Sequence, residues 1–89
     1  MQPDNASFYR NRANIYFRKG WWVLSIGDYT RAINLEPDDF GAYLSRGTAL
    51  ELAKPHIISA FDPIDDFTKA IKLNPSYPLT YHNLSLIHI

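Results

Sequence analysis

The sequence predicts an all-α protein made of stacked repeat units. The first observation is a tyrosine six residues after a proline at three places, Pro3–Tyr9, Pro37–Tyr43 and Pro75–Tyr81, which lie 34 and 38 residues apart. Self-similarity at such a period is typical of repeat arrays. The second observation is that apolar side chains recur at spacings of three and four, as on one face of a helix. No alternating apolar run of useful length is present, so we expect no strands.

The first repeat is expected to hold helices over residues 5–18 and 22–35. The apolar side chains at helical spacing in these segments are Tyr9, Ala13, Tyr16, Phe17, Trp22, Ile26, Tyr29 and Ile33. Asp4 and Asn5 are candidate caps of the first helix. Gly20 stands where the chain turns into the second helix, and glycine readily adopts the backbone conformation that such a turn needs.

The second repeat is expected to hold helices over residues 39–53 and about 62–73, and a fifth helix is expected to begin near residue 78. Asp38 or Asp39 is the expected cap of the 39–53 helix. The small residues of the repeats allow neighbouring helices to approach closely, and these residues are Ala13, Ala32, Gly47 and Ala70.

The start of the 62–73 helix carries a recognisable signal. Asp62 is the expected N-cap, and Pro63 suits the first helical position, where its missing N–H is not needed. Asp65 and Asp66 follow in the first turn, where carboxylates interact favourably with the helix dipole. We therefore interpret this acidic pair as structural rather than catalytic.

Four extra residues distinguish the second repeat from the first, and they fall near residues 54–62. Pro55 does not continue a helix comfortably. One alternative is a long loop whose apolar residues, Ile57, Ile58 and Phe61, fold back over the core. The other is an extra helical turn over 57–61 before a kink at Pro63. In either case the insertion is a candidate binding element, because loops on a rigid scaffold often carry function.

Two segments that precede the later prolines also match each other, Tyr29–Pro37 and Phe67–Pro75. Each has an aromatic residue, an alanine three positions later, and then isoleucine, leucine and proline. This ending resembles that of a tetratricopeptide repeat, and the resemblance covers nearly the whole chain. It implies a right-handed solenoid of antiparallel helix pairs (an A helix and then a B helix), with about two full repeats and a truncated third.

The resemblance divides the chain into residues 1–4 as the tail of a preceding repeat, 5–38 as repeat 1, 39–76 as repeat 2, and 77–89 as a truncated repeat 3. We therefore expect a piece of a longer array. Residues 84–89 have a second interpretation, because a transposon end used to prepare sequencing libraries encodes the same six residues. In that case they are an artefact and carry no function.

The composition of the chain makes several classes of function unexpected. Nine basic and nine acidic residues give no net charge, so a strongly basic nucleic-acid surface is not expected. The chain has no cysteine, which fits a reducing compartment, and we expect a cytoplasmic protein without a membrane segment. The three histidines do not converge in the predicted helices, so no metal site is expected. We predict no enzyme activity, no catalytic residues and no cofactor.

The resemblance implies that the concave surface, lined by A helices, binds a peptide or a partner protein. The residues that the helical spacing directs into this groove are Ser7, Arg10, Asn14, Phe17, Arg18, Gly41, Leu44, Thr48, Glu51 and Leu52. Arg10 and Asn14 lie one turn apart and suit an acidic group. They resemble half of the carboxylate clamp with which some family members hold the acidic C-terminal tails of heat-shock chaperones. The alternative is that both are ordinary solvated side chains.

This chain departs from the clamp at three positions, because Ser45 replaces a second asparagine, and Leu79 and Asn83 replace the later basic residues. A complete clamp is therefore not expected. Arg12 and Arg46 recur at one repeat position, and we expect their stems to cover apolar surface with their charged heads at the rim.

Trp21 and Val23 are large apolar residues at positions where the repeat does not need them. They form either an outer patch for a partner or a surface that lies against a preceding repeat.

We therefore predict a non-catalytic protein–protein interaction scaffold, and three alternatives stay open. One is an RNA-binding helical repeat of the pentatricopeptide kind, and another is the recruiting arm of a larger enzyme. The third is a purely structural array. Because two helix pairs offer few stacking surfaces, self-association through the open repeat ends is also expected.

Overall fold

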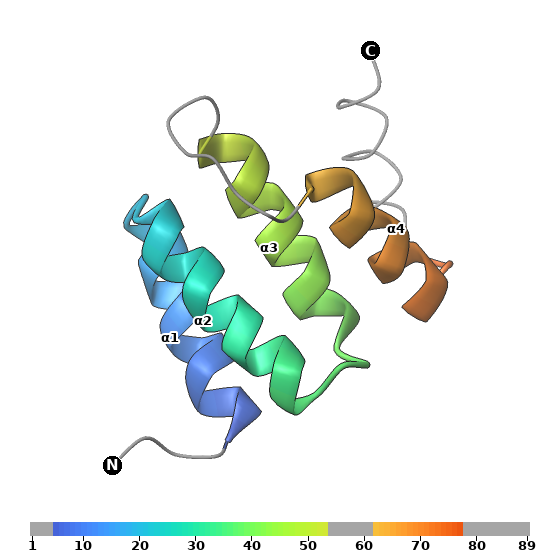
Figure 1. Ribbon diagram of the computed structural model, residues 1–89, viewed down its shortest axis with the longest axis horizontal. Helices are drawn as coiled ribbons and strands as arrows, with labels where there is room; N and C mark the ends of the chain where they lie inside the picture. The colour runs from blue at the N-terminus through green and yellow to red at the C-terminus, as the bar shows by residue number, and fades with distance from the viewer. Residues whose placement is uncertain (1–4, 54–61, 78–89) are drawn as a thin grey trace.

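The computed structural model describes residues 5–53 and 62–77. They form four helices and no strands (Figure 1), namely α1 (Ala6–Arg18), α2 (Trp22–Leu35), α3 (Phe40–Ala53) and α4 (Pro63–Leu73). The helices expected from the sequence agree with these bounds to within one residue at each end. The predicted insertion and the predicted truncated third repeat fall mostly outside the described residues.

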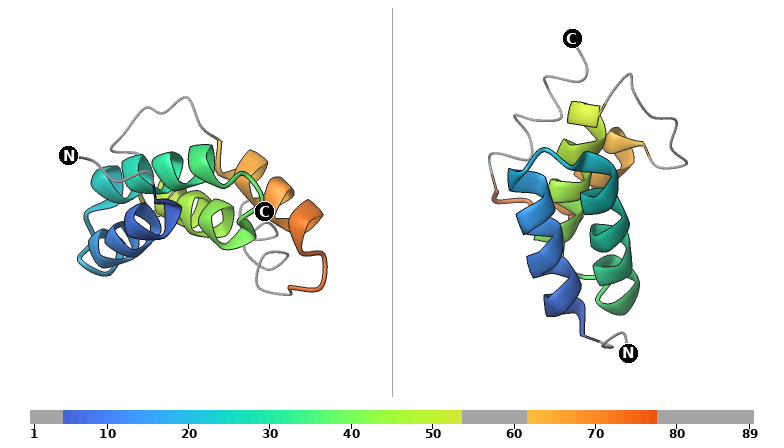
Figure 2. Two further views of the ribbon diagram at one scale, coloured as in Figure 1. Left: turned by 90° about the horizontal axis from the view of Figure 1, so that it is seen from below. Right: turned by 90° about the vertical axis from the view of Figure 1, so that its left-hand side faces the viewer.

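The four helices form two hairpins, α1 with α2 and α3 with α4. Helix α2 packs against both α1 and α3, and therefore joins the two hairpins. In the left view of Figure 2, α1 and α3 lie toward the lower side of the molecule and α2 lies above them. This arrangement confirms the predicted all-α helical repeat. None of the helices that the structure describes has the length and apolar character needed to cross a membrane.

The helix boundaries have local causes in the sequence. The side chain of Asn5 accepts a hydrogen bond from the backbone N–H of Ser7 at 2.9 Å and so caps α1. At the other end, Gly20 has a φ of 77°, in the left-handed region that glycine tolerates. Its N–H bonds to the Phe17 carbonyl, and the Trp21 N–H bonds to the Tyr16 carbonyl. These two bonds form a Schellman motif, which ends α1 at the predicted glycine.

The second hairpin is capped by two aspartates. Of the two candidates for α3, Asp39 is the cap, since its Oδ1 accepts from the backbone N–H of Ala42 at 3.3 Å. Asp62 caps α4 by accepting from the backbone N–H of Ile64 at 2.9 Å, and Pro63 takes the first helical position. Both starts are those that the sequence predicts.

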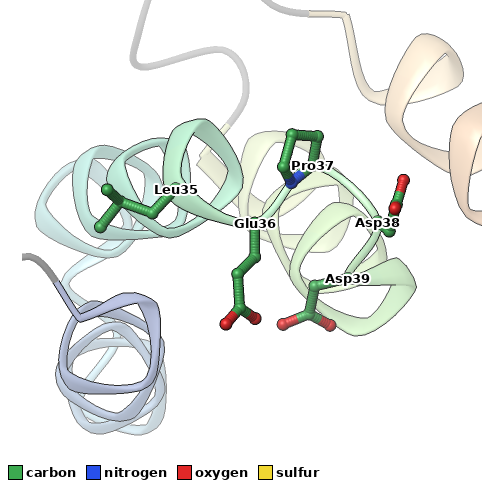
Figure 3. Close-up of a pocket in the computed structure, with 5 residues that line it drawn as sticks. All are labelled: Leu35, Glu36, Pro37, Asp38 and Asp39. Atoms are coloured by element: carbon green, nitrogen blue, oxygen red, sulfur yellow. The ribbon is translucent and has the colours of Figure 1, made fainter.

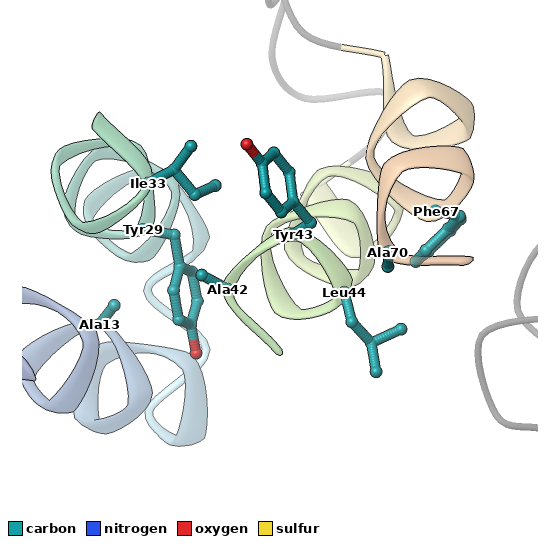
Figure 4. Packing of buried hydrophobic residues seen from close by; sticks show 8 residues of the cluster. All are labelled: Ala13, Tyr29, Ile33, Ala42, Tyr43, Leu44, Phe67 and Ala70. Carbon is teal, nitrogen blue, oxygen red and sulfur yellow. The ribbon is translucent and has the colours of Figure 1, made fainter. Parts of the chain in front are cut away.

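The core runs through both hairpins (Figure 4). The buried residues of its main cluster are Ala13, Tyr29, Ile33, Ala42, Tyr43, Leu44, Phe67 and Ala70. A second cluster, near the other ends of the helices, contains Ile26, Ala49, Leu50 and Ala53. Small residues permit the closest approach: a Cβ added to Gly47 would lie only 2.8 Å from the Phe67 ring.

The prediction that the recurring arginines hold their charged heads at the rim is wrong for Arg46. Arg46 does not hold its charged head at the rim; the residue is 7% exposed, and its Nε and Nη2 donate to both carboxylate oxygens of Asp66. Arg12 donates to both oxygens of Asp28 in the first repeat. A buried carboxylate is stable only with such partners, so each arginine joins the two helices of its own repeat.

Asp66 is also more than the dipole-stabilising residue predicted from the sequence. It is 3% exposed, whereas Asp65 is exposed. Burial raises the pKa of the Asp66 carboxyl, and the hydrogen bonds from Arg46 oppose this shift. The acidic pair therefore consists of one solvated residue and one partner of a buried arginine.

Candidate functional site

Three predicted groove residues on α1 share one face of that helix. Arg10, Asn14 and Phe17 follow at spacings of four and three, and all three are partly exposed. Each contacts a different part of the structure: Arg10 the start of α3, Asn14 a tyrosine of α2, and Phe17 both core clusters. This stripe therefore lies where α1 meets the rest of the molecule, and we call it the α1 stripe.

Arg10 is the charged member of the α1 stripe. Its Nη1 lies 2.7 Å from Asp39 Oδ2, and its Nη2 lies 3.5 Å from Ser7 Oγ. The Arg10 side chain is 37% exposed, so water reaches the guanidinium. A solvent-exposed ion pair of this kind contributes little net stability, about 0–1 kcal/mol. Arg10 is thus accessible to a ligand, but it already has a carboxylate partner.

Asn14 is the amide of the stripe, and its Oδ1 accepts a hydrogen bond from the Tyr29 hydroxyl. Tyr29 is 1% exposed, and this burial raises the pKa of its hydroxyl. In Figure 4 the hydroxyl points to the side of α1 and away from Ile33. The Asn14 amide nitrogen is the part of this side chain that a ligand carbonyl or carboxylate would use.

Phe17 is the apolar member of the α1 stripe. It packs against both core clusters and meets Trp22 edge to face, with ring centroids 5.2 Å apart and planes at 74°. Such a contact fixes the ring and leaves part of it at the surface. Arg18, the next predicted residue, is exposed in the last turn of α1.

The predicted residues on α3 are placed less uniformly. Leu44 is 9% exposed and belongs to the main core cluster, so it offers little surface to a ligand. Thr48 donates to the Leu44 carbonyl at 2.9 Å and is partly exposed. Glu51 is exposed, and Leu52 is 49% exposed. The exposed apolar surface of α3 is therefore provided by Leu52 rather than by Leu44.

The predicted outer patch is exposed in the structure. Trp21 and Val23 are 51% and 61% exposed. Trp21 stacks at a tilt on Tyr16, with centroids 5.9 Å apart, and the Lys19 Nζ lies 5.3 Å from its ring. A cation over an indole face adds a modest attraction and holds the ring in place. Leu24 is also exposed, at 53%, and was not predicted from the sequence as part of this patch.

Sequence reasoning also missed two exposed apolar residues on α1, Phe8 and Ile15. They are 42% and 46% exposed. The equivalent positions in the second repeat, 34 residues later, are Ala42 and Ala49, and both of these residues are 0% exposed. The repeat period is therefore the signal that identifies Phe8 and Ile15 as members of a face that the second repeat buries. We call this the outer α1 face.

A shallow pocket lies at the turn between the two hairpins (Figure 3). It has a volume of about 470 Å³, and it is lined by Leu35, Glu36, Pro37, Asp38 and Asp39. This pocket was not predicted from the sequence. Three of the five lining residues are acidic, and one of them, Asp39, is the partner of Arg10.

Comparisons with known proteins agree with the fold, although no protein-family model matches the chain. The chain is 38% identical over 74 residues to DnaJ homolog subfamily C member 3 of Rattus norvegicus. It is 35% identical over 75 residues to the mitochondrial import receptor subunit TOM70 of the same organism. Each match covers 83% of this chain, but only 14% and 12% of the two relatives.

Two solved structures resemble this chain. One is the first TPR of Spaghetti (RPAP3) bound to the HSP90 peptide SRMEEVD, with a TM-score of 0.87 and 24% identity over 98% of this chain and 66% of that one. The other is the Arabidopsis OM64 TPR domain, with a TM-score of 0.78 and 28% identity over 91% of this chain and 64% of that one. The repeat period, the paired helices and these similarities agree, and the chain belongs to the tetratricopeptide-repeat proteins.

Proposed function

We propose that this chain is a non-catalytic scaffold that binds a peptide or a partner-protein segment on the face formed by α1 and α3. The observation that carries the proposal is the α1 stripe, where a guanidinium, an amide and an aromatic ring follow one another along one side of the helix. Arg10 and Asn14 suit an acidic group, and Phe17 suits an apolar side chain. A solved tetratricopeptide domain of similar fold holds an acidic peptide, which supports this class of ligand.

The proposed ligand is an extended or helical segment with an acidic group near the first repeat. Arg18 adds an exposed positive charge at the end of α1. Further along the face, Leu52 offers exposed apolar surface, and Thr48 and Glu51 offer polar groups. Affinity in the micromolar range is expected, because a short segment loses conformational entropy when it is ordered.

The test is a fluorescence-anisotropy titration of the chain with labelled SRMEEVD peptide. The control peptide replaces both glutamates by glutamine and the aspartate by asparagine. We expect Arg10→Gln to weaken binding of the acidic peptide by about 1–2 kcal/mol, the scale of a charge-assisted hydrogen bond. Lys69→Gln, which removes the same charge from an exposed site on α4, is expected to leave binding unchanged.

The outer patch supplies the competing outcome of this experiment. If binding is insensitive to Arg10→Gln and is lost in Trp21→Ala, the working surface is the outer patch and the proposed face is wrong. Equal binding of the acidic and neutral peptides would contradict the acidic ligand, even if the chain binds both.

We also propose that the chain self-associates through the outer α1 face. Its exposed apolar members, Phe8 and Ile15, occupy the repeat positions that are fully buried between the two hairpins at Ala42 and Ala49. The second hairpin buries its copy of this face against the first hairpin. The exposed copy on α1 is expected to pack against a second chain in the same way, because this contact removes apolar surface from water.

A further inference from the structure

The carboxylate of Asp39 is already paired with Arg10, the cation that the proposed binding face offers to an acidic ligand. Its Oδ2 lies 2.7 Å from Arg10 Nη1. Its Oδ1 accepts from the backbone N–H of Ala42 at 3.3 Å and so caps α3. The Asp39 side chain is 17% exposed, compared with 37% for Arg10. Asp39 is therefore held by its own helix in a position from which it binds the arginine of the neighbouring repeat.

A ligand carboxylate would have to share Arg10 with this aspartate. Carboxylates bind a guanidinium best through two parallel N–H···O bonds. The Nη1 of Arg10 donates to Asp39, and its Nη2 makes only a long contact, at 3.5 Å, with Ser7 Oγ. A ligand that uses both nitrogens of Arg10 would bring a second carboxylate beside Asp39, and two like charges so close repel each other.

A second acidic side chain lies next to this pair. Figure 3 shows the carboxylates of Glu36 and Asp39 projecting in the same direction from the turn between the hairpins, whereas Asp38 projects in another direction. Glu36 therefore adds to the negative charge on the Arg10 side of the turn. Asp38 carries the same charge two positions away from Glu36, but it projects away from the carboxylates of Glu36 and Asp39.

We infer that Asp39 determines the specificity of the proposed binding face by competing with acidic ligands for Arg10. This inference rests on the proposed function, because it requires that Arg10 meets the acidic group of the ligand. The internal carboxylate lowers the affinity for acidic segments, and it restricts binding to ligands whose remaining contacts compensate for displacing it.

The experiment uses Asp39→Asn in the 89-residue chain, with labelled SRMEEVD peptide and the neutral control peptide as probes. Asparagine is as good an N-cap as aspartate, so the start of α3 is kept while the charge is removed. We expect the affinity for the acidic peptide to rise about two- to fivefold, the range that corresponds to an exposed ion pair. The affinity for the neutral peptide is expected to stay the same.

Three further variants isolate the role of the Asp39–Arg10 pair. Asp38→Asn removes the same charge from the adjacent residue and is expected to change the affinity by less than Asp39→Asn. In the double variant Arg10→Gln with Asp39→Asn, the gain is expected to disappear. Asp39→Ser, which also retains a capping side chain, repeats the test if the asparagine variant has less helix by circular dichroism.

The outcomes separate this inference from the proposed function. If binding depends on Arg10 but Asp39→Asn leaves it unchanged or weakens it, Asp39 does not compete and the inference is wrong, while the proposed function stands. An equal gain in Asp38→Asn would also overturn the inference, because the effect would then come from net charge. If neither the original chain nor any variant binds the acidic peptide, both proposals fail.

Discussion

Arg46 and Asp66 form a buried two-point ion pair across the second hairpin. The Nε and Nη2 of Arg46 lie 2.8 and 2.7 Å from the two carboxylate oxygens of Asp66. The Nη1 of the same arginine donates to Thr30 Oγ1 of α2 at 3.2 Å. One side chain of α3 therefore bonds to α4 and to the preceding hairpin, and joins three helices.

The first prediction is that Arg46→Met lowers the free energy of unfolding by about 3–5 kcal/mol, because it leaves the Asp66 charge buried without its partner. A domain of this size has little stability to lose, so the variant is expected to lose its cooperative transition in urea, followed by circular dichroism. Replacing both members, as in Arg46→Met with Asp66→Leu, is expected to cost less than the single change.

Arg12→Met is the matched control, since Arg12 occupies the same repeat position. Its partner Asp28 also accepts from Arg31 Nη1 at 2.8 Å, so the carboxylate keeps one cation after the change. The Arg12 side chain is 35% exposed. A smaller loss of stability than in Arg46→Met is therefore expected. Equal losses in the two variants would show that the deeper burial of the Arg46–Asp66 pair does not increase its contribution to stability.

The second prediction concerns the closest approach of the helices. Gly47→Ala is expected to lower the free energy of unfolding by about 1–2 kcal/mol, because the new Cβ would lie 2.8 Å from a Phe67 ring that is 1% exposed. The same change is favourable for an isolated helix by about 1 kcal/mol, so the overpacking must exceed this gain. Urea unfolding of the variant measures the difference.

Gly27→Ala is the control for the glycine change. It lies within α2, and its added Cβ would meet only Arg31 Nη1 at 3.5 Å, an ordinary contact. This variant is expected to be more stable than the original chain by about 0.5–1 kcal/mol. Stabilisation in both variants would mean that Phe67 moves aside without cost.

The helices were predictable because their signals are local. The bounds of α1 follow from Asn5, from the apolar spacing and from Gly20, all within one short segment. Asp62 and Pro63 likewise mark the start of α4 after an insertion that interrupts the repeat. Caps and turns act through hydrogen bonds between residues a few positions apart, so the sequence contains both partners side by side.

The ion pairs were not predicted, because their partners are 16 and 20 residues apart on different helices. A signal was present nonetheless: Asp28 and Asp66 precede the matching aromatic residues of the two repeats, just as Arg12 and Arg46 recur. The burial of Leu44 had no such signal, because Leu44 belongs to a cluster with residues of other helices, such as Tyr29 and Phe67, that are far from it in the sequence. The sequence thus indicates which residues share a face, but not how much of that face stays open.

The third prediction concerns Tyr29, whose counterpart in the second repeat is Phe67. Tyr29→Phe keeps the ring but removes the hydroxyl that donates to Asn14. Near neutral pH we expect the free energy of unfolding to fall by about 0.5–1.5 kcal/mol, the net value of one hydrogen bond. Urea titrations of the two proteins at the same pH measure this difference.

The same pair of proteins should differ in its response to alkaline pH. Burial raises the pKa of Tyr29 in the folded state, whereas an unfolded tyrosine ionises at about 10. Above that pH the unfolded chain releases this proton first, so the stability contributed by Tyr29 is lost as the pH rises through the folded pKa. The advantage of the original chain over Tyr29→Phe is therefore expected to shrink above pH 10. A constant difference would show that Tyr29 titrates normally in the folded protein.

The last prediction tests self-association through the outer α1 face. Replacing Phe8 and Ile15 by alanine gives this helix the residue that the second repeat has at both equivalent positions, Ala42 and Ala49. We expect the double variant to sediment as a monomer at concentrations where the original chain forms larger species, because it removes two large apolar groups from the contact.

Leu52→Ala is the control for this variant, since it removes an apolar side chain that is 49% exposed but lies on α3. It is expected to leave the sedimentation coefficient at each concentration unchanged. If Leu52→Ala abolishes association and the double variant does not, the copies meet through the binding face rather than through the outer α1 face. In that case an added peptide would compete with self-association, because both would require the same surface of α3.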